Sequence, residues 1–198
     1  VPALAVVKPS TLWQQWQLLE ACTKPNVIVI MQSANTGLTG GSTPTEGCDR
    51  NTVIINTTRI NDIQVLAPQQ QIVAFSGASL FSLEKALSPY GRVAHSVIGS
   101  SCIGASIVGG ICNNSGGALV ERGPAYTELA LYAQVNKDGP LHLINNLDIE
   151  LGDTPEEILT NAQNQTSSLA AITTIDKLTS DRHYTDWVRQ PTDATPTP

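Results

Sequence analysis

Two short apolar runs near the N-terminus flank a segment with helical periodicity. Residues 3–7 form the first run, and residues 27–31 form a second, largely β-branched run that is typical of a buried strand. After Ser10, which can cap a helix, the positions at helical spacing are Leu12, Trp16 and Leu19. The order strand, helix, strand predicts a parallel pair joined by a right-handed crossover.

The rest of the chain shows patterns of further short strands and two more helices. Strands are expected at 53–55, 63–66 and 72–75, and a hairpin is expected from 129–135 and 141–144 across Lys137-Asp138-Gly139-Pro140. Ser79 can cap a helix that ends at Gly91 and buries Leu80, Leu83 and Leu87. Thr154 and Glu157 have the spacing of a capping box, so another helix is expected to begin there.

Composition limits the partners of this chain. The 198 residues carry a net charge of −6, which argues against a surface that neutralises nucleic-acid phosphates. No apolar run approaches the ~20 residues of a membrane-spanning helix. The length allows one domain or two small lobes. Beyond residue 163 the chain becomes polar and then Pro-rich, so we interpret 164–198 as an extended arm or a truncated linker.

Glycine and charge are distributed unevenly along the chain. Of 15 glycines, 11 lie in the windows 37–47 and 99–123, and the stretches 25–45 and 93–120 contain no Asp, Glu, Lys or Arg. One interpretation is that both stretches are loops packed inside the domain, with glycines at tight turns. The other is that their main-chain N–H groups converge on an anion.

Common catalytic and metal motifs are missing from this sequence. It contains neither a GxxxxGK[ST] phosphate loop nor a GxGxxG motif nor a complete nucleophile elbow. The histidines at 95, 142 and 183 are scattered, and His142 is expected on a strand facing solvent. The cysteines at 22, 48, 102 and 112 form no CxxC pair, so we expect reduced thiols. The Asn-x-Ser/Thr sequons at 56, 113 and 164 are interpreted as chance. No catalytic residue and no metal site is predicted.

Two segments carry a recognisable pattern. Residues 32–44 read QSANTGLTGGSTP, and residues 95–117 read HSVIGSSCIGASIVGGICNNSGG. The first resembles the diphosphate-binding loop of flavoproteins with the vanillyl-alcohol oxidase or p-cresol methylhydroxylase type of FAD domain. The second resembles the other FAD-contacting stretch of that family, which ends in Asn-x-Gly-Gly. The order of the two segments and their separation also match.

This resemblance implies an α+β FAD-binding domain of two α/β lobes with FAD between them. A small β-α-β lobe would span 1–90 and carry the diphosphate loop, and a larger lobe with a mixed or antiparallel sheet would span 91–163. The residues that the resemblance assigns to cofactor binding are Ser33, Ala34, Asn35, Thr36, Gly37, Gly41, Ser42, Gly99, Ser106 and Gly116. Family members that bind flavin covalently use a His or Cys tether. The first segment contains no histidine, so we expect non-covalent FAD.

Within the family, both motifs are most similar to those of respiratory flavoenzymes that oxidise D-lactate and reduce quinone. The implied function is the FAD-binding portion of such a 2-hydroxyacid dehydrogenase, with the substrate domain outside this chain. The full-length protein would be peripheral on the inner face of the cell membrane and would contact it through regions not in this chain. Two alternatives remain: the FAD domain of a sugar-nucleotide reductase or aryl-alcohol oxidase, and a non-enzymatic anion-binding domain whose glycines serve packing.

Overall fold

The fold is taken from a computed structural model, which describes residues 2–24, 27–66, 71–94, 99–115, 129–135, 139–147 and 149–164. The first elements in chain order are β1 (Ala5–Val7), α1 (Leu12–Thr23), β2 (Ile28–Gln32), β3 (Thr52–Asn56), β4 (Ile63–Val65) and β5 (Ile72–Ala74). They are followed by α2 (Leu80–Leu87), η1 (Ser88–Tyr90), η2 (Gly99–Ile103), α3 (Ile107–Cys112), β6 (Leu131–Val135), β7 (Leu141–Asn145) and α4 (Pro155–Asn164). The described residues thus combine helices with parallel and antiparallel strands, as expected for an α+β chain.

The strands β1, β2 and β3 form a parallel sheet in the order β1-β3-β2. The predicted strands are therefore present, but the prediction that the first two would pair with each other was wrong, because β3 lies between them. Burial explains the order. Ile54 and Ile55 of β3 are 7% and 0% exposed, whereas Val6 of β1 is 57% exposed and Met31 of β2 is 43% exposed. The most completely buried strand occupies the centre of the sheet.

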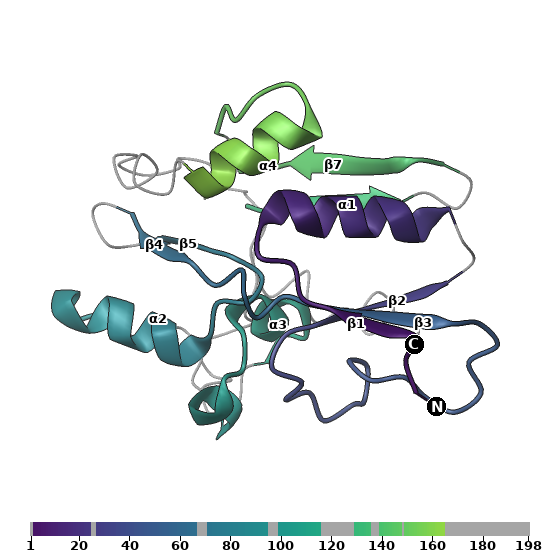
Figure 1. Ribbon diagram of the computed structural model, residues 1–198. Coiled ribbons are helices and arrows are strands. Elements are labelled where there is room, and N and C mark those ends of the chain that lie inside the picture. Colours follow the sequence, from purple (N-terminus) through teal and green to yellow (C-terminus); the bar gives the residue numbers. More distant parts are fainter. Residues whose placement is uncertain are drawn as a thin grey trace, which may run out of the picture.

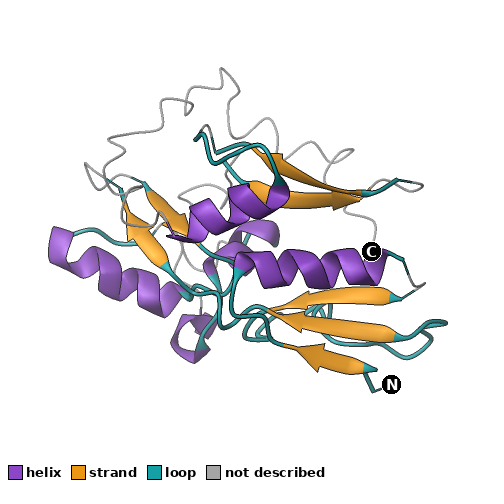
Figure 2. Cartoon of the chain, turned by 45° about the horizontal axis from the view of Figure 1, so that its top comes forward, coloured by secondary structure: helices purple, strands orange, loops and turns teal. Residues whose placement is uncertain are grey.

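Helix α1 lies along one face of this sheet and separates it from the β6-β7 hairpin and α4 (Figures 1 and 2). Trp16 is its buried residue, at 5% exposure, and Leu12 N donates to Gln163 Oε1 of α4 at 2.9 Å. The predicted cap at Ser10 was one residue early. Thr11 caps the helix instead, because it has the extended backbone conformation and its Oγ1 accepts from the main-chain N of the third helical residue at 3.1 Å.

Helix α2 follows its predicted pattern closely. Ser79 caps it, Leu80, Leu83 and Leu87 are its buried residues, and Gly91 adopts a φ of +63° after η1. Strands β4 and β5 pair antiparallel, and partly buried side chains of both pack on this helix's core. That core consists of Ala78, Leu80, Leu83, Leu87, Ala94, Ala105 and Ile107. It therefore joins α2 to the second glycine-rich segment.

The predicted hairpin and capping box are also confirmed. β6 and β7 pair antiparallel, and α4 begins after Thr154, whose Oγ1 accepts from Glu157 N at 3.3 Å. In return, Glu157 Oε2 accepts from the main-chain N of Thr154 and of Asp153, each at 3.1 Å. The main-chain N–H of Thr154, then that of Asp153 and then the Thr154 hydroxyl hold the pKa of the Glu157 carboxyl below its ordinary value.

The other local predictions have mixed outcomes. His142 is exposed on β7 as predicted, whereas His95, His183 and residues 165–198 lie outside the described residues. None of the four cysteines forms a disulfide bond. Within the described ranges, no helix is both long and apolar enough to span a bilayer, and no cluster of His, Cys, Asp and Glu could hold a metal ion.

Candidate functional site

The first glycine-rich segment starts at the carboxyl end of the parallel sheet. β2 ends at Gln32 and β3 ends at Asn56, and these two residues are partners in the sheet register. We call residues 33–42, which follow β2 directly, the anion loop. It begins at the sheet edge where α/β proteins commonly bind their ligands.

Side-chain amides hold both ends of the anion loop. Gln32 Nε2 donates to Ser42 O at 2.8 Å, and Gln32 Oε1 accepts from Asn56 Nδ2 at 3.1 Å. Asn56 Nδ2 also donates to Ser33 O at 2.9 Å, and Asn56 is 6% exposed. The first and last residues of the loop are therefore tied to the ends of β2 and β3.

Most main-chain N–H groups of the anion loop are unpaired. Those from Ser33 to Thr39, and those of Gly41 and Ser42, donate to no acceptor within the described part of the chain. The loop residues are half-buried or exposed, so these groups lie at the surface rather than in the core. Consecutive unpaired N–H groups carry partial positive charge and form a typical anion-binding surface.

The loop is folded back on itself by its own polar groups. Asn35 adopts a φ of +56°, which is uncommon for a residue other than glycine, and Gly40 adopts a φ of +75°. Ser42 Oγ donates to Asn35 Oδ1 at 2.7 Å, and Thr43 N donates to Gly40 O at 3.1 Å. Together with the amide of Gln32, these bonds hold the two halves of the loop together.

One side chain in the loop has an unmet hydrogen-bonding requirement. The Ser33 hydroxyl oxygen is buried and has no hydrogen-bond partner. Buried polar groups without partners are rare, and each calls for an explanation such as an unseen ligand. A phosphate oxygen would satisfy both this hydroxyl and the neighbouring N–H groups, so the residues present fit an anionic diphosphate.

The second glycine-rich segment lies against the first. Gly104 adopts a φ of +95°, and a Cβ placed there would lie 3.5 Å from Ala34 Cβ. Gly99 begins η2, the short helix that precedes Gly104. The structure therefore brings together the two segments that sequence analysis interpreted as one binding site. Gly116, which was also predicted to contact the cofactor, lies outside the described residues.

Ser106 has a structural task in addition to its predicted contact. Its Oγ caps α3 by accepting from Gly109 N at 3.1 Å, and the residue is 8% exposed. Ser106 also forms an isolated antiparallel bridge with Ser79, the cap of α2. The starts of α2 and α3 are therefore fixed to each other beside the second segment.

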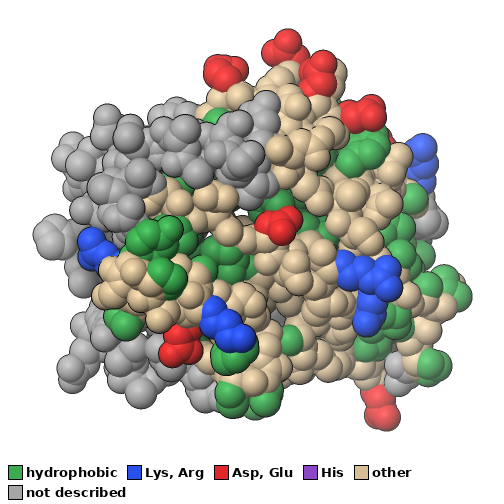
Figure 3. All heavy atoms as spheres, turned by 60° about the vertical axis from the view of Figure 1, so that its left-hand side comes forward, with side chains coloured by type: hydrophobic (Ala, Val, Ile, Leu, Met, Phe, Trp, Pro, Cys, Tyr) green, Lys and Arg blue, Asp and Glu red, His purple; other side chains and the backbone are tan. Residues whose placement is uncertain are grey.

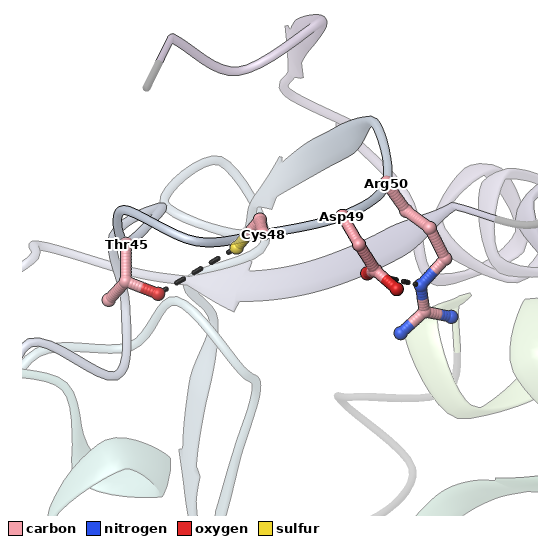
Figure 4. Close-up of polar contacts among 4 residues, drawn as sticks. All are labelled: Thr45, Cys48, Asp49 and Arg50. Carbon is pink, nitrogen blue, oxygen red and sulfur yellow. Dashed lines mark hydrogen bonds and ion pairs between the residues drawn. The ribbon is translucent and has the colours of Figure 1, made fainter.

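Cations near the sheet make contacts away from the anion loop. Arg50 precedes β3, at the amino end of the sheet, and its Nε donates to Asp49 Oδ1 at 3.2 Å (Figure 4). Arg59 follows β3 at the carboxyl end, and its Nη1 donates to Lys8 O, after β1, at 3.5 Å. On the face in Figure 3, acidic side chains gather along the upper edge, and the other charged side chains stand apart among neutral ones. The anion loop itself offers only main-chain N–H groups and neutral side chains as donors.

Two of the cysteines, Cys102 and Cys112, lie within the second segment, and Cys48 follows the anion loop. Cys48 Sγ lies 3.7 Å from Thr45 Oγ1, in the stretch between the loop and β3 (Figure 4). Cys102 is exposed in η2. Desolvation raises the pKa of the Cys112 thiol at the end of α3. Non-covalent attachment of a cofactor remains a prediction.

The residues that support the anion loop were not predicted from the sequence. Asn56 was noted only as part of a sequon, yet its buried amide is bonded to Gln32 and Ser33. Thr57 was not considered, although Thr57 N donates to Gln32 O at 2.8 Å. The available signal was the change from apolar to polar residues at the ends of two strands, which does not reveal that the strands are adjacent.

Comparison with protein families identifies this domain. A family model described as an FAD binding domain matches residues 3–142, which is more than half of the chain. The chain belongs to this FAD binding domain family. FAD is therefore the cofactor of this domain.

This FAD-binding domain is also similar to segments of longer curated proteins. Each of the following relatives is described as a quinone-dependent D-lactate dehydrogenase. The Haemophilus influenzae protein is 54% identical over 195 residues, which cover 98% of this chain and 35% of that protein. The Escherichia coli K12 protein is 59% identical over 158 residues, covering 79% and 28%. The Corynebacterium glutamicum protein is 42% identical over 190 residues, covering 96% and 33%. The chain thus spans about a third of the length of the curated relatives it matches.

Solved structures support the fold of the FAD-binding domain. Two structures of an alkyldihydroxyacetonephosphate synthase match it with TM-scores of 0.55 and 0.51. The first covers 80% of this chain and 28% of the synthase at 19% identity, and the second covers 60% and 22% at 22% identity. At such identities the match concerns the fold alone.

Proposed function

We propose that this FAD-binding domain is part of a flavin-dependent dehydrogenase that oxidises D-lactate and passes the electrons to quinone. The three relatives described by that name are 42–59% identical to the chain. The chain spans only about a third of their length, and we assign the substrate site and the group that takes the substrate proton to another part of the full-length protein. The residues described here form the cofactor side of the reaction.

The observation that carries the proposal is the set of unpaired donors in the anion loop. The N–H groups from Ser33 to Thr39, with those of Gly41 and Ser42, are unpaired and follow a strand at the carboxyl end of the sheet. Hydrogen bonds to charged acceptors contribute about 1.5–3 kcal/mol each. Four or five of them would bind a diphosphate without a cationic side chain, even in a chain with a net charge of −6.

The remaining parts of the binding site follow from the contact between the two segments. We assign the FAD diphosphate to the anion loop, and the rest of FAD to the boundary between a first lobe, 1–90, and a second lobe, 91–163. The approach of Gly104 to Ala34 supports this boundary. Gly99, Ser106 and Gly116 would line it from the second lobe. When bound non-covalently there, FAD supplies the acceptor for the hydride of the substrate CH–OH group and passes the electrons to quinone.

The partners of the full-length protein follow from the same assignment. They are a small 2-hydroxyacid, D-lactate, and a membrane quinone. We propose a peripheral location on the inner face of the cell membrane, with membrane contact through regions outside this chain. The acidic charge of the domain supports this division, because anionic lipid attracts basic rather than acidic surfaces.

Titration of the purified chain with FAD tests the cofactor assignment. A Cβ at Gly41 would meet only Thr39 Oγ1, at the ordinary contact distance of 3.9 Å, so both Gly41→Asp and Gly41→Asn fit the loop. The two variants differ in charge and hardly in shape. Because the aspartate repels the diphosphate, we expect at least about tenfold weaker FAD binding for Gly41→Asp than for Gly41→Asn, with a difference that shrinks as salt is added. Equal affinities, or a folded wild-type chain that does not bind FAD, would contradict the assignment.

The substrate is tested with the full-length protein to which we assign this domain. D-lactate, L-lactate and an aryl alcohol are compared as reductants of the bound flavin, followed by bleaching of its visible absorbance, and a sugar nucleotide is tested as an oxidant of the chemically reduced flavin. Reduction by D-lactate, followed by reoxidation with a soluble quinone, is expected. Reduction by the aryl alcohol alone, or reoxidation by the sugar nucleotide but not by quinone, would replace the proposed activity while leaving the FAD site intact.

A further inference from the structure

The hydrogen bonds of the side-chain amides beneath the anion loop all run in one direction, from donor to acceptor. Thr58 N donates to Asn56 Oδ1 at 3.2 Å, and the Thr58 hydroxyl donates to the same oxygen. Asn56 Nδ2 must then face acceptors, which are Ser33 O and Gln32 Oε1. Gln32 Nε2 in turn faces Ser42 O. Main-chain groups at both ends fix this polarity, because Thr58 N only donates and the two serine carbonyls only accept.

This network also sets the direction of the first peptide groups of the loop. Thr57 N donates to Gln32 O at 2.8 Å, and Asn56 Nδ2 donates to Ser33 O at 2.9 Å. In a trans peptide the N–H points opposite to the C=O of the same unit. The N–H groups of Ser33 and Ala34 therefore both point away from β3, and both are unpaired.

We propose that Asn56 is a positioning residue for FAD, which aims the N–H groups at the start of the anion loop toward the diphosphate. Asn56 does this by holding Ser33 O and, through Gln32, Ser42 O. This inference rests on the assignment of the diphosphate to the anion loop. It adds a residue that lies outside the two glycine-rich segments and that does not itself face the cofactor.

The hydrogen-bond network lies among buried residues, so losing one of its bonds is costly. Asn56 is 6% exposed and Thr57 is 3% exposed, so a carbonyl that lost its donor there would not readily be solvated by water. Without the Asn56 amide, the peptide after Ser33 is free to rotate its carbonyl outward, toward the place proposed for the phosphates. Such a rotation replaces a donor with an acceptor facing an anion. We therefore expect loss of FAD affinity of about tenfold or more.

The test is FAD titration of Asn56→Leu, with Asn61→Leu as its matched control. Leucine is neutral and similar in size to asparagine, so Asn56→Leu removes the amide without adding charge. Asn61 is exposed and forms no hydrogen bond within the described residues, which makes it a suitable control for the same substitution. Circular dichroism and urea unfolding of the FAD-free chain define conditions in which each variant is folded, so that an unfolded fraction does not enter the dissociation constant. We expect Asn56→Leu to bind FAD at least about tenfold more weakly than Asn61→Leu.

A second substitution separates donor geometry from packing. In Asn56→Asp, the neutral acid at low pH can donate to Ser33 O, whereas the carboxylate at higher pH cannot. The side chains that contact Asn56 by hydrogen bonds, Gln32 and Thr58, do not titrate. Relative to wild type at each pH, FAD binding by Asn56→Asp should therefore recover as the pH falls and exceed that of Asn56→Leu. Packing alone would give no such pH dependence.

The outcomes distinguish this inference from the proposed function. If folded wild-type chain does not bind FAD, the assignment of the cofactor to this chain fails. If wild type binds FAD and Asn56→Leu matches Asn61→Leu, the positioning role is wrong and the cofactor assignment stands. An Asn56→Asp variant that remains as weak as Asn56→Leu at low pH also overturns it. Should Asn56→Leu not fold, Gln32→Met, with exposed Gln17→Met as control, removes the link to Ser42 and is expected to show the same loss.

Discussion

Replacing Ser33 by alanine should have opposite effects on the stability of the chain without FAD and on its affinity for FAD. The hydroxyl oxygen is buried and has no hydrogen-bond partner within the protein. It lies at the start of the anion loop, next to unpaired N–H groups. The same group is therefore unfavourable for folding without cofactor and favourable for binding a phosphate oxygen.

The two effects are large enough to measure separately. A buried polar group without a partner costs about 1–3 kcal/mol, so Ser33→Ala should raise the free energy of unfolding of the FAD-free chain by about 1 kcal/mol. In a chain of 198 residues this corresponds to a melting temperature about 2–4 °C higher. A hydroxyl bonded to a charged acceptor contributes about 1.5–3 kcal/mol, so FAD affinity should fall by between about tenfold and a hundredfold.

Urea unfolding of the FAD-free chain and FAD titration provide the two measurements. Ser106→Ala is the matched control, because Ser106 is also buried but its Oγ accepts from Gly109 N. Removing that helix cap should lower the free energy of unfolding by about 1 kcal/mol, the opposite sign. If Ser33→Ala destabilised the FAD-free chain as Ser106→Ala does, the Ser33 hydroxyl would have a partner and the reasoning would fail. Unchanged FAD affinity would refute its contact with the cofactor.

Two further predictions concern the fold that carries the site. Hydrogen bonds lower the pKa of the Glu157 carboxyl in the folded chain, so the unfolded chain binds the proton more readily. The stabilisation that the Glu157 carboxylate provides is therefore full above the unfolded pKa of about 4.3, and it is lost as the pH falls through the lower pKa of the folded chain. Urea midpoints should therefore show Glu157→Ala less stable than Glu156→Ala at pH 7, with the gap narrowing toward pH 3; a gap independent of pH would exclude the carboxylate as its source. Gly77→Ala would place a Cβ against the carbonyl oxygen of Thr57, so we expect a loss of more than about 3 kcal/mol and little soluble protein. A Cβ at Gly110 in α3 would have no neighbour within contact distance, so Gly110→Ala should instead stabilise the FAD-free chain by about 0.5–1 kcal/mol. Equal effects of the two alanine substitutions on the free energy of unfolding would show that the crowding at Gly77 is relieved at little cost.

Local features of the fold followed directly from local sequence. The buried leucines of α2, its Ser79 cap and the end of the helical segment at Gly91 were all predicted. These features depend on side-chain periodicity and on the conformational range of single residues, and a short stretch of sequence is enough to predict both. The adjacent hydroxyls of Ser10 and Thr11 show the limit of this reasoning. Either could cap α1, and backbone conformation selected Thr11.

The order of the parallel sheet was not accessible in this way. The apolar runs of β1, β2 and β3 are similar in length and composition, and parallel neighbours need not be consecutive in the chain. Only packing determined that β3 lies in the centre, where Ile55 is fully buried. That order brings Asn56 beside Gln32, 24 positions earlier, and thereby creates the support of the anion loop.

By itself, the sequence determined that two neutral, glycine-rich segments exist, that the first follows an apolar strand, and that both resemble the cofactor segments of one flavoprotein family. Composition and backbone freedom are properties of the chain itself, so they can be derived from the sequence without knowledge of the fold. The tertiary structure decided that Gly104 lies beside Ala34, that the Ser33 hydroxyl lacks a partner and that the Asn56 amide donates to Ser33 O. Each of these depends on groups distant in sequence meeting within a few ångströms, and strand pairing and core packing, rather than local preference, set those distances.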